Sequence, residues 1–338
     1  MKTDNNAIRK NITDIDDSVV IIAARNEEFN LRKNLRFFLD QKPSGFEIMV
    51  INDNSVDGSF EFLDEIALDF PHLRILNNEY SSGKKTALQK GITATEKEFI
   101  FLTDADCYPK SDNWLHKMRD AFNNEKIDMV LGYSPYTGKK FLSIFIRFET
   151  FMTAIQYFSY TLSGMPYMGV GRNMAFRKNV FTGNQGYNKH LDIQSGNDDL
   201  FVMENATSDN VAIQIDPESF IYTEPAKTLK EFLKQKSRHI STSFRYKNKF
   251  KFLLALYSLS HIGFYISSFV LLLNFYIGEF FFIYTIRITL VMIIAYRPML
   301  RLKESDLFWM IPVLDFFMSL YYIILAFYYA LLPKVSWK

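Results

Sequence analysis

Four short apolar segments alternate with amphipathic stretches in the first third of the chain. Branched and aromatic residues fill residues 19–24, 46–51, 73–76 and 99–104, and each run has the length of a buried strand. The stretches between them repeat their apolar residues at helical spacing. Strands that alternate with helices predict a parallel sheet covered by helices on both faces and joined by right-handed crossovers. We therefore predict an α/β, Rossmann-like domain.

The pattern changes near residue 250, where long apolar segments replace the alternation. No Asp, Glu, Lys or Arg occurs from Phe252 to Gly278, which is ample for one membrane span. The change of pattern and the length of this uncharged segment predict a soluble domain over residues 1–250 and a membrane domain over 251–338. Three spans are expected, at about 252–274, 280–297 and 307–332.

Two charges interrupt the predicted spans, Arg287 in the second and Asp315 in the third. A charge in hydrocarbon is costly unless it is paired or faces a cavity. At 1.5 Å per residue, both lie at about the same depth on antiparallel neighbours. We predict that they form an ion pair.

Two basic clusters flank the first two spans, and three spans would place both clusters on one side. The positive-inside rule makes that side cytoplasmic. The single cysteine, Cys107, excludes an internal disulfide and fits a reducing compartment. Residues 1–17 are polar and lack the apolar core of a secretory signal. We expect a multi-pass protein of the cell (inner) membrane with its soluble domain in the cytoplasm. The clusters are Lys247, Lys249 and Lys251, and Arg297, Arg301 and Lys303.

Composition narrows the class of partner. The formal net charge is +2, so no strong basic excess is present to bind nucleic acid. Aromatic residues make up 16% of the chain and are densest after residue 250, as in a membrane domain. We expect a membrane partner and no nucleic-acid partner.

The fourth apolar segment ends in two carboxylates one residue apart, Asp104 and Asp106. Residues i and i+2 of a strand point to the same face, so both can address one ligand. Their mutual repulsion is relieved by a cation with oxygen preference, Mg²⁺ or Mn²⁺. The alternative is a solvated turn after a core strand.

Other polar side chains also follow predicted strands. Asn26, Asp53 and Lys84 should join Asp106 at the carboxyl edge of the sheet, where ligands of such sheets bind. We predict that Asp53 contacts a nucleotide base and that Asp57, among small turn formers, caps a helix.

Lys84 begins a predicted helix. At such a position it suits a diphosphate, and the alternative is an exposed surface lysine. Gly83-Lys84-Lys85-Thr86 lacks the earlier glycine of a phosphate loop, which excludes the P-loop class.

The segments AARNEE, INDNSVDGS, GKKTALQKG and FLTDAD, in this order, resemble the nucleotide-binding half of family 2 glycosyltransferases with a GT-A fold. The resemblance implies a nucleotide-sugar half over about 17–110 and an acceptor half over about 111–250. It also implies that Asp106 holds the metal on the donor diphosphate. The donor contacts that we expect in this half are Asn26, Glu27, Asp53, Lys84 and Asp104.

The acceptor half holds a helical stretch at 141–159 whose only charges are Arg147 and Glu149. It is either a core helix or an interfacial helix beside a membrane. Further on, the GxGRNMAF pattern resembles the family's acceptor-side strand, which implies acceptor contacts for Arg172 and Asn173.

A second acidic centre lies in Gly196-Asn197-Asp198-Asp199. Transfer to a hydroxyl needs a base, and only one of two adjacent acids is expected to face the acceptor. The segment resembles the family's Gly-Asp/Glu-Asp motif, whose last residue is the base, and this places the role on Asp198. Asn197 stands where an acid is usual, so Asp199 remains the alternative.

Thr228 and Glu231 have the spacing of a capping box and begin a helix. Gln235, Arg238 and His239 lie within one turn of it and present one polar face. One interpretation of this run is a basic helix beside anionic lipid. The other follows from its resemblance to the QxxRW signature of membrane-bound family members, which implies that Gln235 and Arg238 contact the diphosphate and that His239 contacts the acceptor. His239 replaces the tryptophan of that signature.

The resemblance implies an inverting, metal-dependent glycosyltransferase of the hexosyltransferase type. Its donor would be a UDP- or GDP-sugar, its metal Mg²⁺ or Mn²⁺, and its acceptor a lipid-linked or glycan hydroxyl. Two alternatives stay open, a processive polysaccharide synthase and a sugar-nucleotide-binding membrane subunit without turnover.

Overall fold

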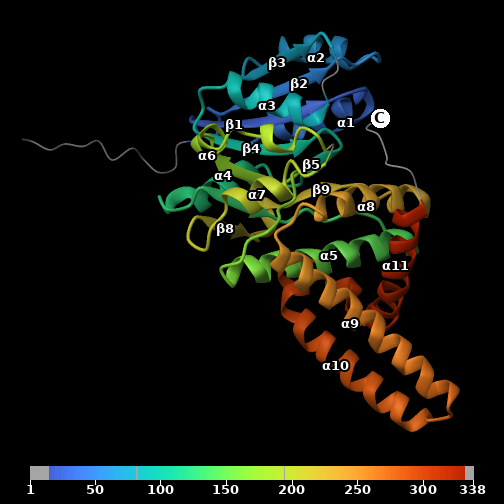
Figure 1. Ribbon diagram of the computed structural model, residues 1–338. Coiled ribbons are helices and arrows are strands. Elements are labelled where there is room, and N and C mark those ends of the chain that lie inside the picture. The colour runs from blue at the N-terminus through green and yellow to red at the C-terminus, as the bar shows by residue number, and fades with distance from the viewer. Residues whose placement is uncertain (1–14, 81–82, 194, 332–338) are drawn as a thin grey trace, which may run out of the picture.

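A sheet domain sits above a group of long apolar helices (Figure 1). The computed structural model describes residues 15–80, 83–193 and 195–331. The N-terminal segment up to residue 14 and the last residue of the third predicted span lie outside these ranges. The strands are β1 (Ser18–Ala24), β2 (Glu47–Asp53), β3 (Leu73–Asn78), β4 (Phe99–Asp104), β5 (Cys107–Pro109), β6 (Met129–Gly132), β7 (Met174–Arg177), β8 (Val211–Gln214) and β9 (Ile221–Thr223).

Helices connect these strands and follow them to the end of the described chain. The helices are α1 (Glu28–Leu39), α2 (Ser59–Ala67), α3 (Lys84–Ala94), α4 (Trp114–Asp120), α5 (Phe141–Leu162), α6 (Lys178–Gly183), α7 (Asp199–Asn205), α8 (Leu229–Ser243), α9 (Asn248–Leu273), α10 (Ile277–Arg301) and α11 (Ile311–Leu331). Short 3₁₀ helices are η1 (Ala121–Asn123), η2 (Asn188–His190), η3 (Pro217–Ser219) and η4 (Ser305–Met310).

The main sheet is mostly parallel, as the alternation of elements predicts. Its order is β3-β2-β1-β4-β7-β6-β8, and a separate pair joins β5 to β9. The four strands of the first third run parallel, β7 runs antiparallel to both of its neighbours, and β6 pairs parallel with β8. The carboxyl ends of β1, β2 and β4 therefore meet at one edge.

Both faces of the sheet are buried, which explains the unbroken apolar runs. On β1, Val19 and Ile21 join the core shared with α3 and α5, while Val20 and Ile22 join the core shared with α1, α2 and α4. Successive side chains point to opposite faces, so each strand serves two cores.

Helix α5 is a core helix of the sheet domain. Ten of its residues are buried, and the Tyr157 hydroxyl donates to the Gly132 carbonyl at 2.9 Å. Its first turns also touch α11, where the rings of Phe141 and Phe317 are 5.3 Å apart. The core interpretation is thus confirmed, and contact of α5 with a membrane stays a prediction.

Three helical segments of the described chain are long and apolar enough to cross a membrane: α9, α10 and Ser305–Leu331. The predicted ion pair between the second and third is confirmed. Arg287 Nε lies 2.8 Å from Asp315 Oδ2, and the Tyr265 hydroxyl of α9 donates to the same oxygen at 2.6 Å. One polar cluster therefore ties all three segments together.

The connection between α10 and α11 is fixed to the sheet domain through Glu304. Its carboxylate is 2% exposed and accepts from the Arg147 guanidinium of α5, at 2.6 Å from Nη2, and from the Tyr133 hydroxyl at 3.1 Å. Arg147 also binds Asp306 at 2.7 Å. The apolar helices are thus anchored to the sheet domain through buried charge.

Candidate active site

The carboxyl edge of the sheet brings Lys84 and Asp104 together, as predicted. Lys84 begins α3, and its Nζ lies 2.5 Å from Oδ1 of Asp104, the last residue of β4. Burial alone would lower the pKa of Lys84, but the negative charges of Asp104, Asp198 and Asp106 outweigh it and raise that pKa. The ammonium group therefore stays charged at this edge.

Asp104, Asp106 and Cys107 form a group able to hold a metal ion. One ligand atom from each lies within 4.8 Å of the others. Burial and the two neighbouring carboxylates raise the pKa of Cys107, and its thiol donates to Asp106 Oδ1 at 3.3 Å. A protonated thiol is a poor ligand. The two carboxylates therefore remain as the metal ligands, and their oxygen atoms fit Mg²⁺ or Mn²⁺.

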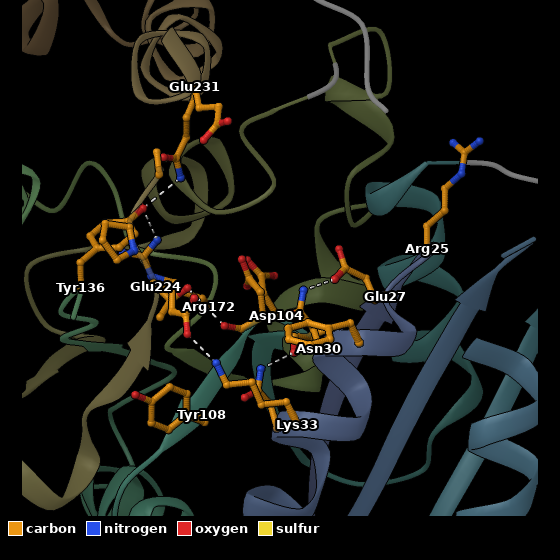
Figure 2. A pocket seen from close by; sticks show the side chains of 18 of the residues that line it. Arg25, Glu27, Asn30, Lys33, Asp104, Tyr108, Tyr136, Arg172, Glu224 and Glu231 are labelled. Atoms are coloured by element: carbon orange, nitrogen blue, oxygen red, sulfur yellow. Dashed lines mark hydrogen bonds and ion pairs between the residues drawn. The ribbon is translucent and has the colours of Figure 1, made fainter. Parts of the chain in front are cut away.

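A cavity of about 640 Å³ opens above this edge. Figure 2 shows Asp104 at its centre, with Glu27, Asn30 and Lys33 of the α1 region on one side. Glu224, from the segment between β9 and α8, approaches from the other side, and its carboxylate lies 2.5 Å from Lys33 Nζ. This ion pair joins the nucleotide half and the acceptor half across the cavity.

Tyr136 links two of the predicted contacts on the acceptor side of the cavity (Figure 2). Its hydroxyl accepts from Arg172 Nη1 at 3.1 Å and from Gln235 Nε2 at 2.9 Å. The Arg172 guanidinium also lies over the Tyr136 ring, 4.5 Å from its centroid, and donates to the Ser134 hydroxyl at 2.6 Å. Arg172 and Gln235 are therefore held in fixed positions.

A second cavity of about 140 Å³ adjoins the first. Asp198, Asp199 and His239 line the second cavity. The two cavities share five lining residues, Lys84, Asp104, Arg172, Gln235 and Arg238. These shared residues form a wall between the two cavities. Three of them, Lys84, Arg172 and Arg238, are cationic, and cationic side chains bind diphosphates.

The structure separates the two candidate bases. Asp198 is partly exposed in the second cavity, accepts from the Gly171 amide at 2.9 Å and caps α7. Asp199 is 4% exposed and accepts from the Tyr246 hydroxyl at 2.6 Å. Burial, with the nearby charge of Asp198, raises the pKa of Asp199 well above its usual range. Asp198 is the better placed of the two to meet an acceptor.

Two glycines allow this arrangement. Gly196 has φ +85°, in the left-handed region that favours glycine. A Cβ on Gly171 would lie 3.1 Å from Asp198 Oδ2, so a side chain there would crowd the carboxylate.

His239 lies in the second cavity near the acids. Partial desolvation of the ring, with the positive charges of Lys236 and Arg238, lowers the pKa of His239. The imidazole is therefore neutral at physiological pH and can accept or donate one hydrogen bond.

Asn173, predicted to contact the acceptor, has a structural role. It is 0% exposed, and its amide nitrogen donates to the carbonyls of Tyr133 and Ser219. Its oxygen accepts from the Trp114 indole at 3.1 Å. In the structure its side-chain amide holds the loop before β7, and its contact with an acceptor stays a prediction.

Asn26 and Asp53 lie at the predicted edge but do not line the two cavities described above. Asn26 has φ +55°, and its side-chain oxygen accepts from the Val56 amide. Asp53 is 2% exposed, and its carboxylate accepts from the Gly83 amide at 3.0 Å. Their donor contacts stay predictions.

The capping role predicted for Asp57 is confirmed. One carboxylate oxygen accepts from the Ser59 amide at 3.0 Å, and the other accepts from the Glu28 amide at 3.1 Å. It thereby holds the starts of both α1 and α2.

Sequence reasoning missed Tyr136 and Lys33. Tyr136 follows β6 without a motif, and Lys33 resembles any exposed helix lysine. Only the fold brings them to the cavity, so the chain offers no local signal for either residue.

The fold and the carboxyl edge of its sheet define the class of protein. It has a GT-A fold, two carboxylates able to hold a metal at that edge, and a cavity wall with three cationic side chains. Residues 19–182 match the family model described as Glycosyl transferase family 2. This segment, just under half of the chain, is similar to that family.

Curated relatives are similar to part of the chain. A beta-monoglucosyldiacylglycerol synthase of Trichormus variabilis is 33% identical over 115 residues, which are 33% of this chain and 24% of that protein. A probable glycosyltransferase, YdaM, of Bacillus subtilis is 27% identical over 149 residues, 42% of this chain and 36% of that protein. The chain thus spans about a quarter to a third of the length of these relatives.

A solved structure shares the fold over most of the chain. It is a mannosyltransferase of Pyrobaculum calidifontis, in complex with GDP-Man and Mn²⁺, with TM-score 0.56 and 14% identity over 90% of this chain and 87% of that one. At this identity the likeness shows the fold alone.

Proposed function

We propose that this protein is an inverting glycosyltransferase that moves a sugar from a nucleotide-diphosphate sugar to a hydroxyl of a lipid-linked or glycan acceptor. The observation that carries the proposal is the pair of joined cavities. One holds the carboxylates Asp104 and Asp106, the other holds Asp198, and a wall with three cationic side chains separates them. The mannosyltransferase with the same fold binds GDP-Man and Mn²⁺, which supports a donor and a metal of these classes.

Asp104 and Asp106 would hold Mg²⁺ or Mn²⁺, whose charge would stabilise the diphosphate as it leaves. Lys84, Arg172 and Arg238 add fixed positive charge to the same wall. Asp198 takes the proton of the acceptor hydroxyl, whose oxygen attacks the anomeric carbon from the side opposite the diphosphate. The sugar is transferred with inversion, and the nucleoside diphosphate departs.

We place the reaction at the cytoplasmic face of the inner membrane. The support is the three apolar segments attached directly below the sheet domain and the basic residues at the start of α9 and the end of α10. A beta-monoglucosyldiacylglycerol synthase among the relatives supports a lipid acceptor.

Donor binding tests the proposal by thermal stability. The detergent-purified protein is heated with each nucleotide sugar, with and without Mn²⁺. A donor at 100 times its Kd adds about 2.7 kcal/mol to the free energy of unfolding. We expect one donor class to stabilise the protein only with metal, and Asp106→Asn to abolish that effect.

Transfer is then measured with the radiolabelled donor and a membrane lipid extract. Incorporation into lipid or glycan supports the enzyme. Metal-dependent stabilisation without transfer to any acceptor would instead favour a binding subunit, and no stabilisation by any donor would overturn the proposal.

A further inference from the structure

Both ends of the third apolar segment contact the sheet domain. At its start, Asp306 lies 2.7 Å from Arg147 of α5. Near its end, the Tyr329 ring stacks on Phe244, the residue that follows α8, with centroids 5.6 Å apart. A helix that crosses about 30 Å of hydrocarbon would carry these ends to opposite sides.

The middle of the segment also meets the sheet domain. The Phe317 ring lies 5.3 Å from that of Phe141 on α5, and the Tyr321 ring lies 5.5 Å from that of Phe232 on α8. Asp315 pairs with Arg287, about 21 Å before the end of α10 at 1.5 Å per residue. Asp315 contacts Tyr265 of α9, whereas Tyr322 contacts Tyr257, nearer the start of that helix. Helix α11 therefore runs toward the start of α9, and it lies beside one end of α5 (Figure 1).

We propose that residues 305–331 form a re-entrant segment that does not cross the membrane. The segment begins as η4 and continues directly into α11, whose contacts with α5 and α8 keep it on the side it came from. The protein then crosses twice, through α9 and α10, in place of the three spans expected from the sequence. This inference rests on the membrane placement proposed above.

The packing of α11 fits lipid on one face and protein on the other. Of its most apolar window, 39% is buried, against 11% for α9 and 6% for α10. The buried residues contact α5, α8 and α9. The exposed ones recur at helical spacing and would face acyl chains. The exposed stripe is Val313, Phe316, Leu320, Ile324, Phe327 and Leu331.

Backbone groups in the first turns of α11 have partners inside the protein, as a re-entrant segment requires. The Tyr284 hydroxyl donates to the Pro312 carbonyl at 3.0 Å. The His261 ring lies 2.9 Å from the Asp315 carbonyl. Pro312 itself lacks an amide proton, so it adds no orphan donor at the helix start.

The charge pattern supports the same topology independently. Lys334 and Lys338 follow α11 in the sequence. A third crossing would place both lysines opposite the clusters at Lys247–Lys251 and Arg297–Lys303, against the positive-inside rule. The re-entrant arrangement places all of them on one side.

Cysteine accessibility tests the topology in the full-length chain. Cys107 is buried and is the only cysteine, so a Cys107→Ala background is free of reactive thiols. Single cysteines replace Asn274 at the α9–α10 tip, Ser305 at the start of η4, and Lys334, which follows α11 in the sequence. Spheroplasts are treated with a membrane-impermeant maleimide before and after permeabilisation.

We expect Asn274→Cys to react in intact spheroplasts, and Ser305→Cys and Lys334→Cys to react only after permeabilisation. Reaction of Lys334→Cys in intact spheroplasts, beside a protected Ser305→Cys, would overturn the re-entrant segment and leave the membrane placement standing. Recovery of the protein in the soluble fraction would overturn the membrane placement itself. Donor-induced stabilisation, measured separately, reports on the proposed reaction and not on topology.

Discussion

At the scale of single residues, neighbouring side chains of one type hold different roles because their surroundings differ. Asp198 and Asp199 both line the second cavity, but Asp198 is partly exposed there, while Asp199, the next residue, is buried and binds Tyr246. Cys107 lies against Asp106 and keeps its proton because burial raises its pKa. Local position in the fold, more than residue type, decides which group can react.

The roles of the two aspartates can be separated by conservative variants. Asp198→Asn removes the base, and we expect kcat to fall about 10²- to 10⁴-fold with donor stabilisation unchanged. Asp199→Asn keeps an oxygen for the Tyr246 hydroxyl, so we expect a much smaller loss. The kcat of both variants is measured by transfer of radiolabelled sugar to the acceptor. Full activity of Asp198→Asn would remove the proposed base.

The Tyr136 hydroxyl can be deleted without removing the ring that Arg172 covers. In Tyr136→Phe, Arg172 and Gln235 lose the hydroxyl oxygen to which both donate. We expect kcat/KM to fall roughly 5- to 30-fold, which corresponds to a loss of about 1–2 kcal/mol of transition-state stabilisation. Tyr108→Phe, on β5 in the same cavity, is the matched control and should change little. Equal losses in both variants would argue against a specific role for Tyr136.

At the scale of elements, a few charged contacts fix helices that apolar packing alone would leave free to slide. Arg287 and Asp315 join α10 to α11, and Tyr265 of α9 completes the cluster. Glu149 of α5 and Lys236 of α8 form a second interhelical pair at 2.5 Å, which Tyr321 of α11 approaches. Helix α8, which carries Arg238 of the cationic wall, is thereby held in place by α11.

The Arg287–Asp315 pair predicts a clear pattern in a double-mutant cycle. Each single variant, Arg287→Met or Asp315→Asn, leaves a charge without its partner, and we expect a loss of about 3–5 kcal/mol of stability. The double variant should lose less than the sum of the two. Thermal unfolding in detergent measures all three proteins. Strict additivity would show that the two side chains are not coupled.

At the scale of the whole molecule, the connection at Glu304 makes the docking of the two parts sensitive to pH. Burial raises the pKa of Glu304 to about 7, although Arg147 and Tyr133 act to lower it. In the unfolded chain the pKa is near 4.5. Between these values the folded protein retains a proton that the unfolded chain has released.

The stability that Glu304 contributes is therefore present below about pH 4.5 and declines as the pH rises to about 7. The decline from this group is roughly 3 kcal/mol at most. We expect Glu304→Gln to flatten the dependence of melting temperature on pH across this window, while Asp306→Asn, an exposed partner of the same arginine, leaves it in place. An unchanged slope in Glu304→Gln would refute this assignment.

The sequence by itself determined the alternation of elements, the mostly parallel sheet, the acidic pair at the end of β4 and the charge pair in the apolar helices. The first three features are local, because periodicity and strand-end position depend on neighbours in the chain. The charge pair was predicted from the similar depth of its two members on adjacent antiparallel helices. The same local information could not predict that Asn173 is buried. Its burial depends on contacts with Trp114 and Ser219, which are distant in sequence.

Only the tertiary structure brought Tyr136 and Lys33 to the cavity, distinguished Asp198 from Asp199, and placed the third apolar segment against the sheet domain. Apolar length can report that a helix prefers lipid, but it carries no direction. The direction of α11 is set by contacts of Asp315 and Tyr329 with residues far away in the chain. Long-range contacts of this kind are a property of the folded molecule alone.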